Sequence, residues 1–121
     1  MLIKMVKIDS TKFGSITIDG KTHHEEDNYI ISWDGEITGL HTAQRHLFDE
    51  PELEMILKRN PEMLIVGTGD SGLLKLSEEA KRKCKQNAIG LIYDISRKAI
   101  VKFNENVIKG KKVIAFIHVT C

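Results

Sequence analysis

A glycine-rich segment follows an apolar stretch in the middle of the chain. Gly67-Thr68-Gly69-Asp70-Ser71-Gly72 has the spacing G-x-G-x-x-G and comes directly after residues 63–66, Met-Leu-Ile-Val. Successive backbone amides in such a loop can bind an anionic group, and the hydroxyls of Thr68 and Ser71 add further hydrogen-bonding groups. Residues 67–71 are therefore candidate ligand-binding residues. The alternative is a tight turn that needs glycine flexibility.

Dinucleotide binding is a second interpretation of the same motif. Asp94 lies 22 residues beyond Gly72, close to where a ribose-binding acid would stand. A dinucleotide site also needs a helix that begins at the glycines, because the helix N-terminus holds the pyrophosphate. Here the next helix is expected to begin late, near Ser77, and too few strands follow to complete the usual sheet. The residues therefore favour a ligand-facing loop over a nucleotide fold.

Histidines and acids gather at two places without a known metal pattern. Residues 23–27 read His-His-Glu-Glu-Asp, and His41 and His46 are five residues apart. Neighbouring side chains of a strand point to opposite faces, so His23 and His24 would not converge on one ion. We expect no metal and no cofactor.

The two cysteines give no disulfide framework. Cys121 with His118 is the only local pairing of a thiol with an imidazole, and Cys84 is expected to pack inside a helix interface as a small apolar residue. No apolar run is long enough to span a membrane, and no targeting segment is recognised. These features predict a cytoplasmic protein that does not bind membranes.

The first part of the chain, residues 1–48, is predicted to be rich in β-strands. Apolar and polar residues alternate around Val6 and Ile16, which is the period of a half-buried strand. Asp19-Gly20 and Asp34-Gly35 each follow such a run and are typical of hairpin turns. Between Glu36 and Phe48 the pattern is irregular and predicts no element.

The second part, residues 49–121, alternates helices and strands. Helices are expected from Asp49 to Asn60, from Ser77 to Asn87 and from Ser96 to Gly110, and strands at 63–66, 88–93 and 113–119. Units of this kind form parallel strands with ligand sites at the carboxyl ends. The sequence thus predicts one α/β domain spanning 1–121, with residues 67–71, residues 94–96 and the last residues meeting at one rim.

The charge is divided unevenly along the chain. Residues 1–60 contain 11 acids and 7 bases, whereas residues 61–121 contain 6 acids and 11 bases, which gives −4 and +5. Nucleic-acid binding is not favoured, since the bases form no stripe interleaved with aromatic residues. The opposite signs are compatible with a protein partner or a homo-oligomer.

Several short motifs follow one another along the chain: Phe13-Gly14, Trp33 followed by His41, Ile65-Val66-Gly67-Thr68-Gly69, Ala99 with Phe103-Asn104, and His118-Val119-Thr120-Cys121. Together they resemble a small domain family of unknown function, shared by the mitochondrial complex I assembly factor subfamily and the vertebrate adipogenesis-associated domain-containing protein. The resemblance implies a three-layer α/β fold with a mixed central sheet and a β-hairpin-rich N-terminal portion. It also places the glycine loop in a cleft at the rim of the sheet, and it brings no established activity, cofactor or catalytic residue.

These observations predict a non-enzymatic binding or assembly module. Its cleft would be formed by Gly67 to Ser71 with Trp33, His41 and Asn104 as neighbours, and it would recognise a protein partner, a second copy of the chain or a small anion. The alternative is a small enzyme acting on an anionic metabolite, with His41 as acid or base. Dinucleotide binding at the glycine loop is the third candidate.

Overall fold

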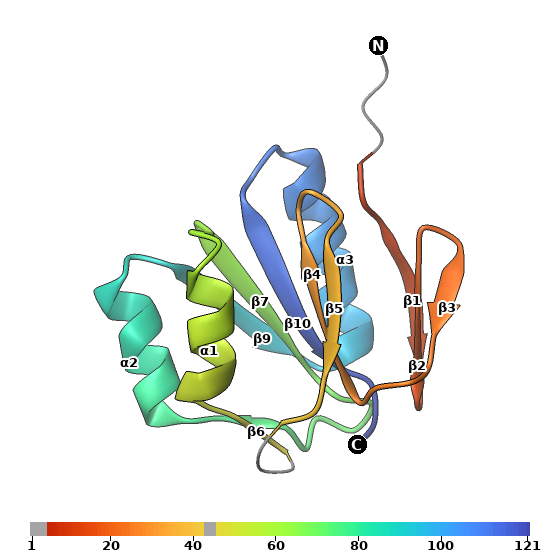
Figure 1. The fold of residues 1–121 in the computed structure, drawn as a ribbon, viewed down its shortest axis with the longest axis horizontal. Coiled ribbons are helices and arrows are strands. Elements are labelled where there is room, and N and C mark those ends of the chain that lie inside the picture. Colours follow the sequence, from red (N-terminus) through yellow and green to blue (C-terminus); the bar gives the residue numbers. More distant parts are fainter. Residues whose placement is uncertain (1–4, 43–45) are drawn as a thin grey trace.

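The computed structural model describes residues 5–42 and 46–121. Within these residues the chain forms ten strands and three helices (Figure 1). In chain order they are β1 (Ile8–Lys12), β2 (Ser15–Ile18), β3 (Lys21–His23), β4 (Asn28–Ser32), β5 (Ile37–Leu40), β6 (Leu47–Phe48), α1 (Glu50–Leu57), β7 (Met63–Thr68), β8 (Lys75–Leu76), α2 (Glu78–Gln86), β9 (Gly90–Asp94), α3 (Ser96–Ile108) and β10 (Val113–His118).

A five-stranded mixed sheet forms the centre of the fold, with the strand order β5-β4-β10-β7-β9. The central strand β10 pairs parallel with β7 and antiparallel with β4. On the other side of β7, β9 is also parallel. The carboxyl ends of β7, β9 and β10 therefore lie along one edge of the sheet, which we call the rim.

Both faces of this sheet are covered. Alternate residues of β10 therefore pack in two separate hydrophobic cores. Val113, Ala115 and Ile117 pack with α3 and with the small sheet β1–β3. Ile114 and Phe116 pack with residues of α1 and α2 on the opposite face. This arrangement confirms the predicted α/β fold with three layers and a mixed central sheet.

The two predicted hairpin turns are present. Asp19 and Gly20 connect β2 to β3 with φ angles of 48° and 80°, a left-handed conformation that glycine tolerates and that two-residue hairpins require. Asp34 and Gly35 lie in the turn between β4 and β5, where the Gly35 amide donates to the Ser32 carbonyl at 2.9 Å.

The helix after the glycine loop begins late, as predicted. The Ser77 hydroxyl accepts from the Ala80 amide and caps α2, whose first turn carries Glu78 and Glu79. Before it, the short strand β8 pairs parallel with β6. Sequence periodicity did not predict β6 or β8, because strands of two residues are too short to show a period. It did not predict β5 either, because the apolar residues Ile37 and Leu40 are three positions apart and do not alternate.

Candidate functional site

The glycine loop lies at the rim, and several of its amides already have acceptors within the chain. The Gly69 amide donates to the Ser96 hydroxyl at 2.9 Å, and the Asp70 amide donates to the Thr120 carbonyl at 2.8 Å. The amides of Ser71 and Leu73 both donate to the main-chain oxygen of Cys121 at 3.1 Å. Three amides of the predicted loop, those of Gly69, Asp70 and Ser71, thus donate to Ser96 and to residues 120–121.

The close contact between the loop and the last residues explains the need for glycine. Gly69 has a φ of 106°, and a Cβ at this position would lie 2.7 Å from the main-chain oxygen of Cys121. Among the other predicted loop residues, Gly67 and Thr68 are buried, whereas Asp70 and Ser71 are exposed. The loop therefore packs at the rim against the main chain of residues 120–121 and hydrogen-bonds to it.

A pocket of about 510 Å³ opens at the rim beside the last residues of the chain. We call it the rim pocket, and it is lined by Phe13, Asp27, His41, Thr42, His46, His118, Thr120 and Cys121. These residues come from five segments that the order of strands brings together: the β1–β2 turn, the residue before β4, the segment after β5, the residue before β6 and the end of β10. The pocket combines imidazole, carboxylate and hydroxyl groups with one exposed aromatic ring.

His118 at the end of β10 is held in one orientation. Its Nδ1 lies 2.8 Å from Asn28 Oδ1, and Asn28 Nδ2 in turn donates to the Leu40 carbonyl at 3.2 Å. The Asn28 oxygen must therefore accept from Nδ1, which leaves the lone pair of a neutral ring on Nε2. This Nε2 lies 3.0 Å from the Thr120 hydroxyl, which can donate to it.

The surroundings of His118 favour its neutral form. Its side chain is buried, and burial is the main cause that lowers the pKa of His118 below the ordinary value, followed by the neighbouring His46. The two rings meet edge to face with centroids 5.6 Å apart. Among the described residues, Nδ1 of His46 is buried without a hydrogen-bond partner.

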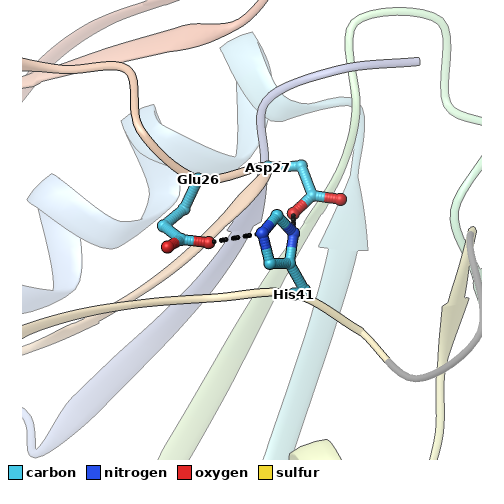
Figure 2. A group of neighbouring side chains, drawn as sticks. All are labelled: Glu26, Asp27 and His41. Carbon is cyan, nitrogen blue, oxygen red and sulfur yellow. Dashed lines mark hydrogen bonds and ion pairs between the residues drawn. The ribbon is translucent and has the colours of Figure 1, made fainter.

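His41 lies between two carboxylates at the mouth of the pocket (Figure 2). Its Nδ1 is 2.5 Å from Asp27 Oδ1 and its Nε2 is 3.1 Å from Glu26 Oε2. Only the contact with Asp27 is a hydrogen bond, because Glu26 Oε2 is buried and has no hydrogen-bond partner among the described residues. The pairing of Asn28 with Leu40 in β4 and β5 places residues 27 and 41 side by side.

The same trio contains the residue types that bind metals, with one ligand atom from each residue within 4.8 Å of the others. In the sequence, Glu26 and Asp27 stand close to His23 and His24 and far from His41. The signal that connects them is the Asp34-Gly35 turn, since a hairpin centred there brings residue 41 opposite residue 27. In the present geometry each of the two carboxylates contacts a different nitrogen of the His41 ring.

Two predicted neighbours of the glycine loop lie elsewhere. Trp33 follows β4, which is antiparallel to β10, so it sits at the opposite end of the sheet, where its amide donates to the Val113 carbonyl. Asn104 on α3 hydrogen-bonds both main-chain groups of Ile8, at 2.9 Å and 2.8 Å, and fixes β1 against the helix. Of the three predicted neighbours, only His41 reaches the rim.

Both cysteines are free thiols. Cys84 is buried on α2, and burial raises the pKa of its thiol, which disfavours the reactive thiolate. Cys121 and His118 both line the rim pocket, but the His118 Nε2 already has the Thr120 hydroxyl as its partner.

The matching family model is described as a protein of unknown function (DUF498/DUF598), and it matches residues 8–118. The chain belongs to this family. Its members have no assigned function in that description, so the membership confirms the predicted domain family of unknown function and leaves the role of the rim pocket to be argued from geometry.

Solved structures share this fold. The conserved hypothetical protein PH1505 from Pyrococcus horikoshii is 31% identical over 95% of this chain and 99% of its own, with a TM-score of 0.80. A protein titled MT938 is 27% identical over 96% and 99% of the two chains, with a TM-score of 0.79. A Bordetella pertussis protein titled a Mth938-like domain shares the fold at 14% identity over 93% and 85%, with a TM-score of 0.68.

No curated protein matches the chain. In the described ranges, 5–42 and 46–121, none of the helices has both the length and the apolar character needed to cross a bilayer.

Proposed function

We propose that the protein is a non-enzymatic binding module whose ligand site is the rim pocket. The observation that carries this proposal is the fixed His118, held by Asn28 and Thr120 at the base of a hollow that also contains Asp27 and Phe13. Pockets at the carboxyl ends of parallel strands are the usual ligand sites of α/β sheets. A site whose polar groups are already oriented loses little freedom when a ligand binds.

The charges around the pocket favour a ligand that donates hydrogen bonds or carries a positive charge. Asp27 lines the pocket, and Glu26 stands on the other side of His41, so the trio has a formal charge of −1 even with His41 protonated. An anion, the ligand expected from the glycine loop, is less favoured because the amides of Asp70 and Ser71 in that loop already donate to residues 120–121. Phe13 offers an exposed ring for an apolar or cationic part of the ligand.

A titration with matched small molecules tests this function. Benzylamine, benzyl alcohol and benzoate share a ring and differ in charge, and amide shifts of isotope-labelled protein report where each one binds. We expect benzylamine to shift His118 and Asp27, and benzoate to bind more weakly. The Asp27→Asn variant should lose the preference for the amine, whereas Asp70→Asn, a matched change on the exposed loop, should keep it. Tighter binding of benzoate, or shifts away from the rim, would overturn the proposal.

The enzymatic alternative rests on one geometric observation. Asp27 contacts Nδ1 of His41 in the way that a carboxylate orients a catalytic base, but the opposite nitrogen faces Glu26. A substrate would have to displace Glu26 before His41 could act on it. If the protein were a small enzyme acting on an anionic metabolite, Glu26→Gln should raise turnover of that metabolite, a result that the binding proposal does not predict.

The predictions about partners, location in the cell and subfamily stay predictions. They comprise a protein partner or a homo-oligomer, a cytoplasmic location, and kinship with the mitochondrial complex I assembly factor and adipogenesis-associated subfamilies. Dinucleotide binding loses support, because α2 begins at Glu78 and its N-terminus is capped by Ser77 within the chain.

A further inference from the structure

The strand β9 is an edge strand of the central sheet. One side of its main chain has no partner strand among the described residues. The Gly90 amide donates to the Glu62 carbonyl, and the Ser96 amide donates to the Gly69 carbonyl. Main-chain groups alternate sides along a strand, so the even-numbered residues face β7. The amides and carbonyls of Leu91 and Tyr93 therefore point outward.

Basic side chains stand beside this free edge on the side of α3. A shallow hollow of about 370 Å³ next to the end of β9 is lined by Asp94, Arg97, Lys98, Val101 and Lys102. In the described part of the chain, none of its three basic groups has an acid within ion-pair distance. Val101 is 51% exposed in the same hollow, so the charges surround an apolar contact surface.

A further basic group lies on the other face of the edge, near α2. The Lys81 ammonium is 5.2 Å from the centroid of the Tyr93 ring, and its acidic neighbour Glu78 is 3.5 Å away. Tyr93 itself is 49% exposed. The free hydrogen-bonding groups of β9 thus lie between positive charges on both faces of the sheet, with Asp94 as the acid at one end.

We propose that β9 binds an extended, acidic segment of another protein as an added strand. The outward amides and carbonyls of Leu91 and Tyr93 would form the main-chain hydrogen bonds, and Lys98 and Lys102 would pair with carboxylates on the segment. A second copy of this chain is a poorer occupant, because two-fold pairing of β9 with itself would bring two sets of these basic residues together. This surface is separate from the rim pocket and does not depend on its ligand.

The experiment measures binding of a synthetic peptide, acetyl-Glu-Val-Glu-Val-Glu-Val-Glu-amide, to the intact chain. Its counterpart with lysine in place of glutamate serves as the charge control. We expect only the acidic peptide to bind, to shift the amides of Leu91 and Tyr93, and to slow their hydrogen exchange. Shifts confined to other strands, binding of both peptides, or no binding would overturn the proposal.

Two pairs of charge reversals separate a local site from general attraction. Lys98→Glu with Lys102→Glu should weaken binding of the acidic peptide at least about tenfold. The matched pair Lys12→Glu with Lys21→Glu changes the net charge equally on the exposed sheet β1–β3 and should leave the affinity within about twofold. All four residues are exposed, so the variants are expected to fold. Equal loss in both pairs would contradict a site at β9, and dimerisation through β9 would assign the edge to a second copy.

Discussion

The hydroxyl of Ser96 accepts a hydrogen bond from the buried amide of Gly69 at 2.9 Å, and it donates to the His118 carbonyl at 2.6 Å. Through one side chain, the first residue of α3 thus joins the ends of β7 and β10. The rim is held together at this point by two hydrogen bonds that water does not reach, since Ser96 is 2% exposed.

Removing this hydroxyl should therefore destabilise the fold. Ser96→Ala leaves a buried donor and a buried acceptor unpaired, and we expect the free energy of unfolding to fall by about 1–3 kcal/mol. Denaturant unfolding measures the change, and Ser71→Ala, at an exposed position of the same loop, serves as the control. Equal stability of the two variants would show that the Ser96 contacts contribute little.

The contact between Gly69 and Cys121 predicts a second effect. Gly69→Ala combines a left-handed backbone with a Cβ in van der Waals conflict with the main chain of Cys121, so residues 120–121 must move. Gly110→Ala is the matched control, because Gly110 also has a positive φ, 78°, but a Cβ added there would meet nothing within 4 Å. We expect a clearly larger loss of stability for Gly69→Ala, with amide shifts concentrated around the rim pocket.

The lowered pKa of His118 predicts how stability depends on pH. The unfolded chain takes up the proton near the ordinary value of 6.5, whereas the folded chain takes it up only at lower pH. Unfolding therefore binds a proton in this interval, and stability falls as the pH drops below about 6.5, by at most about 1.4 kcal/mol per pH unit for one proton.

Unfolding curves between pH 8 and pH 5, in steps of about half a unit, test this dependence. The His118→Gln variant should lose a large part of the slope, because glutamine does not titrate. His24→Gln removes an exposed histidine and should keep the slope of the parent chain. A slope that is unchanged in His118→Gln would assign the pH dependence to other groups.

Asn104 predicts a local loss of order. Its amide satisfies both main-chain groups of Ile8, so Asn104→Ala should destabilise the chain by about 1–3 kcal/mol and increase hydrogen exchange in β1 and β2. Asn87→Ala removes an exposed side-chain bond to the Lys83 carbonyl and should have a smaller effect. Equal exchange of β1 in both variants would contradict the role of Asn104.

Much of the fold could be predicted from the sequence, because its second half carries strong local signals. The apolar run before Gly67, the cap at Ser77 and the helix stop at Gly110 each determine an element through short-range chemistry. The strands β6 and β8 could not be predicted, since each has two residues and exists only through pairing with the other. Their formation depends on tertiary contacts, not on local preference.

The candidate site was predictable only in part. Parallel strands required Gly69 and Ser96 to meet at one rim, and they do. The predicted place of Trp33 at the rim was wrong, because local sequence patterns do not reveal the direction of β4 relative to β10. The two strands pair antiparallel, so residue 33 lies at the end of the sheet opposite the rim. The occupation of the loop amides by residues 120–121 was equally inaccessible, because hydrogen bonds between distant segments leave no periodic trace.

The place of β10 in the sheet also bears on biosynthesis. Residues 113–118 form the strand between β4 and β7. Until these residues leave the ribosome, β4 and β7 have no strand between them. Both cores draw residues from β10 as well, which means that neither can close early. Nascent chains should therefore stay incompletely folded and bind chaperones until residues 113–118 have left the exit tunnel.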